Sequence, residues 1–197
     1  MSSITPSQTV GPYFAIGLTP ESLGLNWTAS LTNDLVTPDV SGERIRIKGR
    51  VLDGDGAPID DCLLEIWQAD AAGRYAHPAD RRALPNAAFK GFGRAATDAG
   101  GAYAFSTIKP GPVSGPGAAL QAPHIVVAVF ARGMLRQQYT RIYFADEAAN
   151  AEDAVLALVP EERRSTLMAR RQPGAGPVAY TFDIHLQGDR ETVFFDV

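Results

Sequence analysis

The sequence has a single cysteine, Cys62, among 197 residues. One thiol cannot form an internal disulfide and is typical of a protein from a reducing compartment. The N-terminus has neither a basic patch nor an apolar segment, so we expect no secretory signal. No apolar run approaches the roughly 20 residues that span a bilayer. We therefore expect a soluble, cytoplasmic protein.

An excess of positive charge is also absent. The chain has 18 basic and 22 acidic residues and a net charge of −4. No block of lysine or arginine stands out, so the electrostatic signature of a nucleic-acid-binding protein is missing.

Several enzyme signatures are missing. The sequence contains no G-x-S-x-G motif, no P-loop, no G-x-G-x-x-G after a strand and no H-E-x-x-H. These absences argue against a serine hydrolase, a nucleotide-dependent enzyme and a zinc protease. Only three histidines are present, so a histidine-rich metal site is hard to assemble. His77 and His185 belong to no supporting pattern, and we predict that they lie on the surface.

Short β-rich segments separated by turn residues make up most of the chain. We predict strands at residues 43–51, 62–67, 103–108, 125–130, 139–144 and 180–186. The segments 125–130 and 139–144, joined by a short connection containing Gly133, predict a hairpin at the centre of a sheet. In residues 180–186, apolar and polar side chains alternate most regularly.

The predicted fold is all-β: a β-sandwich of about eight strands with an N-terminal extended arm and one or two short helices. Pro6 and Gly11-Pro12 exclude a helix interior up to Phe14. Thr19-Pro20-Glu21 predicts the start of a short helix, and a longer one is predicted from Pro160 to Arg171. We divide the chain into an arm and linker, residues 1–42, and a sandwich domain, residues 43–197.

His124 lies in a segment that resembles a metal-binding strand. Side chains two residues apart on a strand share a face, so a His-x-His pair directs both imidazoles at one metal. Here the partner position is Val126, which has no ligating atom.

Three motifs resemble those of the intradiol ring-cleaving dioxygenases. They are EIWQADAAGRY at residues 65–75, TIKPG at 107–111 and APHI at 122–125. With TPSQTVGPY at residues 5–13 and the segment 188–197, the resemblance covers nearly the whole chain. It is to the branch whose substrate is protocatechuate, and within it to the alpha subunits.

The resemblance implies a ferric site from which half the ligands have been lost. In the family, the catalytic chain holds a non-haem Fe(III) ion with two tyrosinates and two histidines. Tyr75 and His124 match the first ligand of each type, whereas Val113 and Val126 occupy the positions of the second. We therefore expect no metal in this chain, and an Fe(III) ion held by a homologous, iron-bearing beta subunit. Such heterodimers are expected to assemble into a larger oligomer.

The resemblance also implies that this chain lines the substrate pocket of its partner. The matching residues are Thr9, Gly11, Pro12, Tyr13 and Arg132. A carboxylated catechol needs a cation near its carboxylate, and the forked donors of an arginine suit a planar anion. A Gly-Pro pair lets the backbone approach a ligand closely in a fixed conformation.

Structural explanations stand beside these roles. Arg132 is also explained as an ordinary residue at a hairpin end, His124 as a hydrogen-bonded core residue and Tyr75 as a packed tyrosine. The segment from Thr9 to Tyr13 is also explained as an arm that only latches subunits together. Two other functions stay open: an independent enzyme with a metal on His124, Tyr75 and a third side chain, and a β-sandwich interaction module without chemistry.

Overall fold

The computed structural model of the chain describes residues 11, 13–25, 32–82, 89–115, 117, 119–174 and 176–196. It confirms the predicted all-β class. The strands are β1 Arg44–Leu52, β2 Leu63–Trp67, β3 Phe92–Ala96, β4 Ala102–Ile108, β5 Val113–Ser114, β6 Leu120–Gln121, β7 His124–Phe130, β8 Gln138–Phe144, β9 Met168–Arg171, β10 Val178–Thr181 and β11 Ile184–His185. The helices are α1 Tyr13–Leu18 and α2 Glu161–Arg164, with short 3-10 helices at Pro20–Leu23, Ala148–Glu152, Leu156–Leu158 and Ser165–Leu167.

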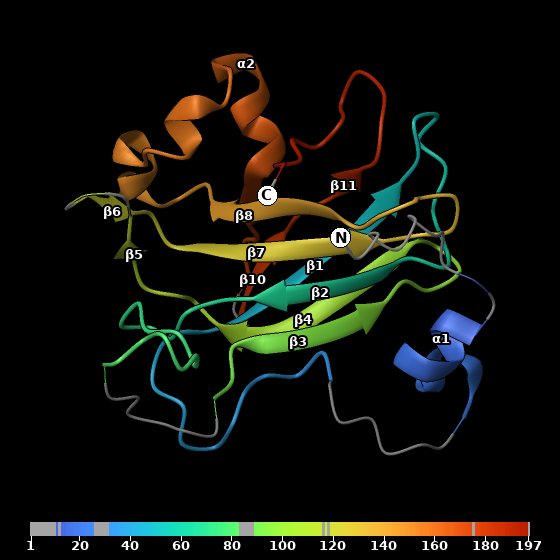
Figure 1. The fold of residues 1–197 in the computed structure, drawn as a ribbon, viewed down its shortest axis with the longest axis horizontal. Helices are drawn as coiled ribbons and strands as arrows, with labels where there is room; N and C mark the ends of the chain where they lie inside the picture. Colours follow the sequence, from blue (N-terminus) through green and yellow to red (C-terminus); the bar gives the residue numbers. More distant parts are fainter. Residues whose placement is uncertain are drawn as a thin grey trace, which may run out of the picture.

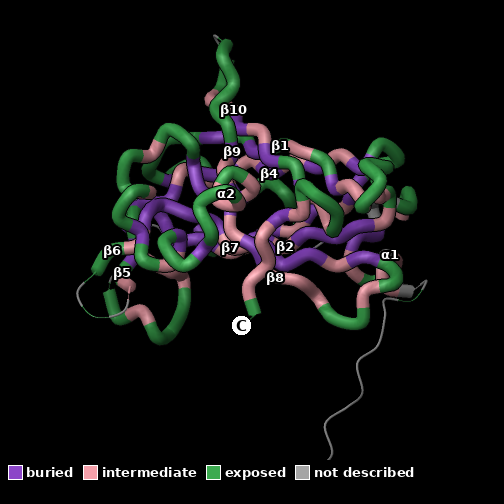
Figure 2. The backbone as a smooth tube through the Cα atoms, turned by 90° about the horizontal axis from the view of Figure 1, so that it is seen from above, coloured by how far each residue is buried: buried purple, intermediate pink, exposed green. Residues whose placement is uncertain are grey.

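Nine of the strands form one mixed sheet, and β5 and β6 form a second, two-stranded sheet. Along the large sheet the order is β3-β2-β7-β8-β9-β10-β1, with β4 on the far side of β1 and β11 continuing the edge of β10. Figure 1 shows β8, β7, β2 and β3 in a layer in front of β10, β1 and β4. Figure 2 shows these two layers from above, with buried segments in both. The sheet therefore bends on itself as a sandwich.

The core lies between the layers because alternate strand residues face inward. In β1, Ile45, Ile47 and Val51 are buried, while the charged residues between them are exposed. In β7, Ile125, Val127 and Val129 are fully buried, because alternate residues of this strand also face the core. The other face of β7 carries His124 and Val126, so the candidate metal positions lie outside the main core.

The sheet is closed between its two edges by a segment that precedes β1. The carbonyl of Thr32 accepts a hydrogen bond from the amide of Arg94 in β3. On the other edge, Leu35 N donates to the carbonyl of Ser106 in β4, at 2.8 Å. This segment satisfies backbone groups on both edges, which otherwise would invite pairing with another chain.

The central hairpin is confirmed, with β7 and β8 antiparallel and His124 opposite Tyr143. The predicted helix from Pro160 to Arg171 is wrong after its first turns. Met168–Arg171 is strand β9, which pairs with both β8 and β10. Ala169 is completely buried there, so sheet pairing and burial outweigh the local helical signal.

The predicted strand 180–186 is interrupted. Its alternation holds, since Tyr180, Phe182 and Ile184 are buried, but the paired segments are β10 and β11. Between them, the side chain of Asp183 accepts a hydrogen bond from Arg50 N, at 2.9 Å. A side-chain acceptor thus replaces a backbone carbonyl and breaks the ladder. Sequence alternation does not reveal such a substitution.

Three smaller corrections concern strand number, the arm and one histidine. The described residues form eleven strands where about eight were predicted, and β3 and the short pair β5–β6 were not predicted. Helix α1 begins at Tyr13, inside the segment predicted to be extended up to Phe14. His77 is exposed as predicted, but His185 is half-buried, since β11 packs beside β1. The short helix predicted after Thr19 is confirmed by the 3-10 helix Pro20–Leu23.

No helix in the described part of the chain is long and apolar enough to cross a membrane.

Candidate functional site

The predicted metal positions lie at the start of β7. His124 and Val126 point to the same face of the strand, since they are two residues apart. Val126 lies opposite Trp67 of β2 on one side and opposite Arg141 of β8 on the other. We call the surroundings of Tyr75, Val113, His124 and Val126 the remnant site.

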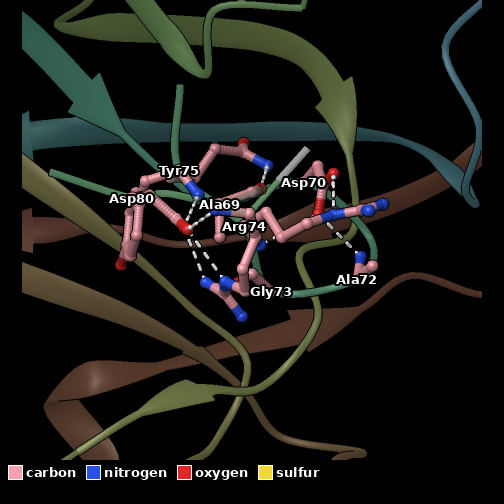
Figure 3. A network of polar contacts seen from close by, with 9 residues as sticks. Ala69, Asp70, Ala72, Gly73, Arg74, Tyr75 and Asp80 are labelled. Carbon is pink, nitrogen blue, oxygen red and sulfur yellow. Dashed lines mark hydrogen bonds and ion pairs between the residues drawn. The ribbon is translucent and has the colours of Figure 1, made fainter. Parts of the chain in front are cut away.

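Tyr75 is positioned by a loop built around two aspartates (Figure 3). Asp70 accepts hydrogen bonds from the amides of Ala72 and Arg74, at 2.8 and 2.9 Å, and pairs with the Arg74 side chain. The amide of Tyr75 donates to Asp80 Oδ2, at 2.9 Å. The polar residues of the motif that carries the family resemblance therefore fold the loop.

Asp80 is in turn fixed by Arg82. Arg82 Nη2 lies 2.6 Å from Asp80 Oδ2 and also donates to the carbonyl of Gly73, at 2.8 Å. Hydrogen bonds from Arg82 and from the amide of Tyr75 hold the pKa of the Asp80 carboxyl well below its ordinary value. This ion pair ties the end of the loop back to its beginning.

Two loops that carry Tyr75 and Val113 approach each other closely at a glycine. Gly73 has a φ of +72°, and a β-carbon there would lie 1.9 Å from the carbonyl oxygen of Pro112. Only glycine avoids both the left-handed strain and the collision. The G of the G-R-Y sequence therefore sets the distance between the first and second ligand positions.

The ring of Tyr75 stacks on Trp67. Their centroids are 5.8 Å apart and the planes are inclined by 11°. Burial raises the pKa of the Tyr75 hydroxyl, and the charge of Arg141 opposes that rise. The structural interpretation of Tyr75 as a packed residue is consistent with this stack, and its hydroxyl is protonated at neutral pH.

His124 is buried and already bonded. Its side chain Nδ1 donates to the carbonyl oxygen of Ala122, at 2.7 Å, and the residue is 4% exposed. Burial and the nearby charge of Arg141 lower the pKa of His124 to about 4. A neutral imidazole is the form that binds metals. The imidazole ring of His124 also packs against the ring of Tyr143, with centroids 5.6 Å apart.

Asp153 anchors the start of β7. Its carboxylate accepts hydrogen bonds from the amides of Ala122 and Leu156, both at 2.7 Å, and from the hydroxyl of Tyr143, at 3.1 Å. It also accepts one from the amide of Val155. Asp153 is 1% exposed, so these donors compensate for the desolvation of its charge. Burial raises the pKa of the Tyr143 hydroxyl to about 12.

Val113, the second valine, lies on the small sheet. It is 5% exposed and directly opposite Gln121 of β6. Gln121 Oε1 accepts a hydrogen bond from Arg141 Nη1, at 2.7 Å. The structure therefore brings all four predicted positions toward the same region, with Arg141 among them.

Arg132 lies at the opposite end of β7. Phe130 is six residues after His124 along the strand, which corresponds to about 20 Å. The Arg132 side chain is 71% exposed and forms ion pairs with Asp60 and Asp61, both at 3.3 Å. Asp60 and Asp61 also line a groove of about 780 Å³.

Of the N-terminal candidates, the structure describes Gly11 and Tyr13. Thr9 and Pro12 lie outside the described residues. Gly11 is exposed, and its carbonyl accepts a hydrogen bond from Phe14 N, at 3.0 Å; Tyr13 is the first residue of α1. The ring of Phe14 packs 5.8 Å from that of Phe130, two residues before Arg132. The substrate-lining role of this set stays a prediction.

Comparisons with known proteins identify the family of the chain. The model of a dioxygenase family matches residues 11–188. The protocatechuate 3,4-dioxygenase alpha chain of Burkholderia cepacia is 50% identical over 98% of this chain and 97% of its own length. The chain belongs to the intradiol dioxygenase family.

Two further relatives show how far the family likeness extends. The protocatechuate 3,4-dioxygenase beta chain of Burkholderia cepacia is 39% identical, over 75% of this chain and 66% of that one. The solved dioxygenase domain of a dioxygenase–carbohydrate-binding fusion from Streptomyces sp. SirexAA-E has a TM-score of 0.62 and 29% identity, and the match covers 94% of this chain and 99% of that domain. The chain therefore shares its fold with this dioxygenase domain.

The intradiol dioxygenase family implies non-haem iron in the enzyme, but the remnant site does not fit it. Val113 and Val126 offer only hydrocarbon, so two of the four ligand positions have no atom that could bind a metal. Within the described part of the chain, no group of three or more His, Cys, Asp or Glu side chains could hold a metal ion. The absence of a metal in the isolated chain stays a prediction for metal analysis.

The sequence did not predict three residues that are important in this region. Arg141 and Gln121 belong to no motif, and Asp153 lies in a loop with no obvious signal. Arg141 could have been noticed as the residue of the predicted strand 139–144 that brings a charge into an otherwise apolar and aromatic stretch. Its register with Val126 could not have been deduced, because that depends on the hairpin connection.

Proposed function

We propose that this chain is the alpha subunit of a protocatechuate 3,4-dioxygenase. In this proposal it is paired with a homologous beta subunit that holds the Fe(III) ion, and the heterodimers assemble further. The enzyme cleaves protocatechuate with O2, between its two hydroxylated carbons, to 3-carboxy-cis,cis-muconate. The chain is 50% identical to an alpha chain over nearly its whole length, which supports the role of an alpha subunit. The likeness to a beta chain of Burkholderia cepacia, which also has such an alpha chain, supports a heteromeric enzyme.

One observation supports the proposal that the reaction takes place on the beta subunit and that this chain lines the pocket. Arg132, which follows the end of β7, and the remnant site at the start of β7 lie at opposite ends of this strand, about 20 Å apart. Arg132 and the start of α1 therefore cannot serve a reaction at the remnant site. In this proposal, Arg132 and the start of α1 border the substrate pocket of the beta subunit.

Arg132 is suited to bind the carboxylate of the substrate. Its side chain is 71% exposed, and its present partners are the partly exposed Asp60 and Asp61. Exposed ion pairs contribute about 0–1 kcal/mol, so a carboxylate in a less hydrated pocket can replace them. The forked guanidinium then makes two parallel hydrogen bonds to the planar anion. The chain thus orients the substrate, and the reacting atoms lie on its partner.

The N-terminal segment completes the proposed wall of the pocket. Thr9, Gly11, Pro12 and Tyr13 precede or begin α1, which packs on the end of β7 through Phe14 and Phe130. We also propose that the arm within residues 1–42 packs on the beta subunit. The residues from Thr32 onward already pack on their own sandwich.

Co-expression with a beta subunit that has all four ligand residues tests this function. We expect the two chains to purify together, and protocatechuate turnover to require both. The beta subunit alone should show weak turnover, because one wall of its pocket is missing. Turnover by this chain alone would contradict the proposal, as would failure of the two chains to associate. The second result would favour an interaction module that has left the family's chemistry.

A further inference from the structure

The backbone of Arg132 is fixed by a tight turn that follows β7. The amide of Met134 donates to the carbonyl of Ala131, at 3.2 Å, and Gly133 has a φ of +82°. Such a hydrogen bond, with a left-handed glycine in the third place of the turn, is typical of a type II turn. Ala131 is buried in the core, and Met134 packs against that core. The base of the Arg132 side chain is therefore held in place, although the side chain itself is exposed.

Asp61 faces Arg132 because of the register between β2 and β7. Leu63 of β2 lies opposite Phe130 of β7, and the two strands are antiparallel. The same register, extended by two residues beyond both of these positions, places Asp61 opposite Arg132. The two side chains meet there, since Arg132 Nε lies 3.3 Å from Asp61 Oδ2. The sheet itself therefore presents this aspartate to the arginine.

Asp60 contacts a different part of the guanidinium. Arg132 Nη2 donates a hydrogen bond to Asp60 Oδ1, at 3.3 Å. Asp61 therefore engages the nitrogen nearest the side-chain stem, whereas Asp60 engages one of the two terminal nitrogens. A carboxylate that is bound end-on by two parallel hydrogen bonds needs both terminal nitrogens, Nη1 and Nη2. Such a ligand competes with Asp60 for Arg132, but it does not compete with Asp61.

The two aspartates also differ in burial. The side chain of Asp60 is 53% exposed and that of Asp61 is 31% exposed, so Asp60 has more room to turn into water. The amide of Cys62, the residue after Asp61, is fixed by Thr97 Oγ1, at 2.9 Å. Asp61 Oδ1 is buried and has no hydrogen-bond partner among the described residues. A buried oxygen without a donor destabilises the fold, so stability alone does not explain this carboxylate.

We propose that Asp61 is a positioning residue for Arg132, and that Asp60 is the contact which the substrate carboxylate replaces. Asp61 holds the Nε side of the guanidinium, so that Nη1 and Nη2 are available together for the carboxylate. A long side chain that is already oriented loses less conformational entropy when it binds a ligand. This inference rests on the proposed function, in which Arg132 binds the carboxylate of protocatechuate, and it adds two residues that determine specificity.

Asp61→Asn and Asp60→Asn are compared in the enzyme assembled with the beta subunit. Each substitution keeps the size of the side chain and removes one negative charge beside Arg132. Long-range charge alone predicts the same result for both variants, a lower KM for the protocatechuate anion. Positioning by Asp61 predicts opposite results, so this pair of variants separates the two explanations. Asp39→Asn, which removes an exposed charge before β1, controls for the change in net charge.

We expect Asp61→Asn to raise the KM for protocatechuate about 3- to 10-fold, because an arginine that is no longer held must be ordered when the substrate binds. Asp60→Asn should leave this KM unchanged or lower it by up to about fivefold, which is the strength of an exposed ion pair. In both variants, kcat and the KM for catechol should change little. A KM for protocatechuate that Asp61→Asn leaves unchanged or lowers would overturn the inference.

Combining Asp61→Asn with Arg132→Ala shows whether Asp61 acts through Arg132. We expect no further rise in the KM for protocatechuate in the double variant, because the residue that Asp61 positions is gone. A further rise would reveal a merely structural role and overturn the inference. If Arg132→Ala raises this KM and Asp61→Asn does not, the inference fails and the carboxylate-binding role of Arg132 stands. If neither variant raises it, both fail.

Discussion

Arg141 Nη1 lies 2.7 Å from Gln121 Oε1, and this bond links the strand beside Val126 to the strand beside Val113. The remnant site is therefore not an empty ligand cage. Arg141 bonds to Gln121 and Tyr143, and His124 Nδ1 bonds to the carbonyl of Ala122, as partly buried polar groups need partners. These contacts tie β6 to β8, and β8 pairs with β7.

Replacing Asp153 tests what holds this architecture. Asp153→Ala leaves the amides of Ala122, Val155 and Leu156 without their acceptor in a buried place. We expect the free energy of unfolding to fall by about 3 kcal/mol or more. Denaturant unfolding measures it.

Asp98→Ala is the matched control for Asp153. Asp98 also accepts two backbone amide hydrogen bonds, from Gly100 and Ala102, but it is exposed. Water replaces the lost acceptor there, so we expect a loss of about 1 kcal/mol. Equal losses for the two variants would show that Asp153 is no special anchor.

Gly73 tests the close approach of the two loops of the remnant site. Gly73→Ala forces a left-handed alanine and a collision with the carbonyl of Pro112. Gly56→Ala is the control, since its φ is +82° and nothing lies within 4 Å of an added β-carbon. We expect Gly56→Ala to cost about 1–2 kcal/mol and Gly73→Ala about 1–3 kcal/mol more. Thermal and denaturant unfolding of both variants would decide; similar stabilities would argue against a tight contact.

Arg132 is tested in the assembled enzyme with two substrates. We expect Arg132→Ala to raise the KM for protocatechuate by about 10- to 100-fold, because a charge-assisted hydrogen bond is worth about 1.5–3 kcal/mol. The KM for catechol, which has no carboxylate, should change little. Arg136→Ala is the control, since both side chains are 71% exposed. Equal effects of Arg132→Ala on the two substrates would remove this residue from carboxylate binding.

Cys62 gives a prediction on reactivity and alkaline stability. Burial raises the pKa of its thiol from 9.0 to about 12, and the residue is 1% exposed. At about pH 8 the thiolate fraction falls from roughly one-tenth to roughly one in ten thousand. We expect a thiol reagent to label the folded chain at least about a thousandfold more slowly than the unfolded chain. Rapid labelling of the folded chain would contradict the burial of Cys62.

The same shift makes folding sensitive to high pH. Only the unfolded thiol ionises between about pH 9 and about pH 12, so the free energy of unfolding decreases as pH rises through this range. Below pH 9 both states are protonated, and the contribution is fully present. Cys62→Ala should show a shallower loss of stability above about pH 9. An unchanged slope would mean that other groups dominate the alkaline transition.

The sequence predicts the strands whose inner face is regularly apolar. Residues 43–51 and the hairpin 125–144 are found because burial on one face dictates their alternation. Met168–Arg171 was assigned to a helix because its neighbours have helical charge placement, whereas its parallel pairing with β8 is non-local. Strand β3 was missed because its glycine and alanines give no pattern, although Gly93 is needed where Leu35 packs closely.

The candidate site is predictable where a motif matches residue by residue. Tyr75, Val113, His124 and Val126 were named from the resemblance, and the structure places them on neighbouring elements; their descent from iron ligands stays a prediction. Arg141 was not predictable in the same way. Its role depends on the register of β7 against β8 and on a side-chain bond to Gln121. Register and side-chain direction follow from tertiary packing, so a single sequence does not specify them locally.

Metal analysis of this chain, purified without a beta subunit after growth with ample iron, tests the central claim most directly. The account predicts a colourless protein with far less than one iron per chain, and stoichiometric ferric iron only after association with the beta subunit. Stoichiometric ferric iron in the isolated chain, with a visible phenolate-to-iron band, would contradict it.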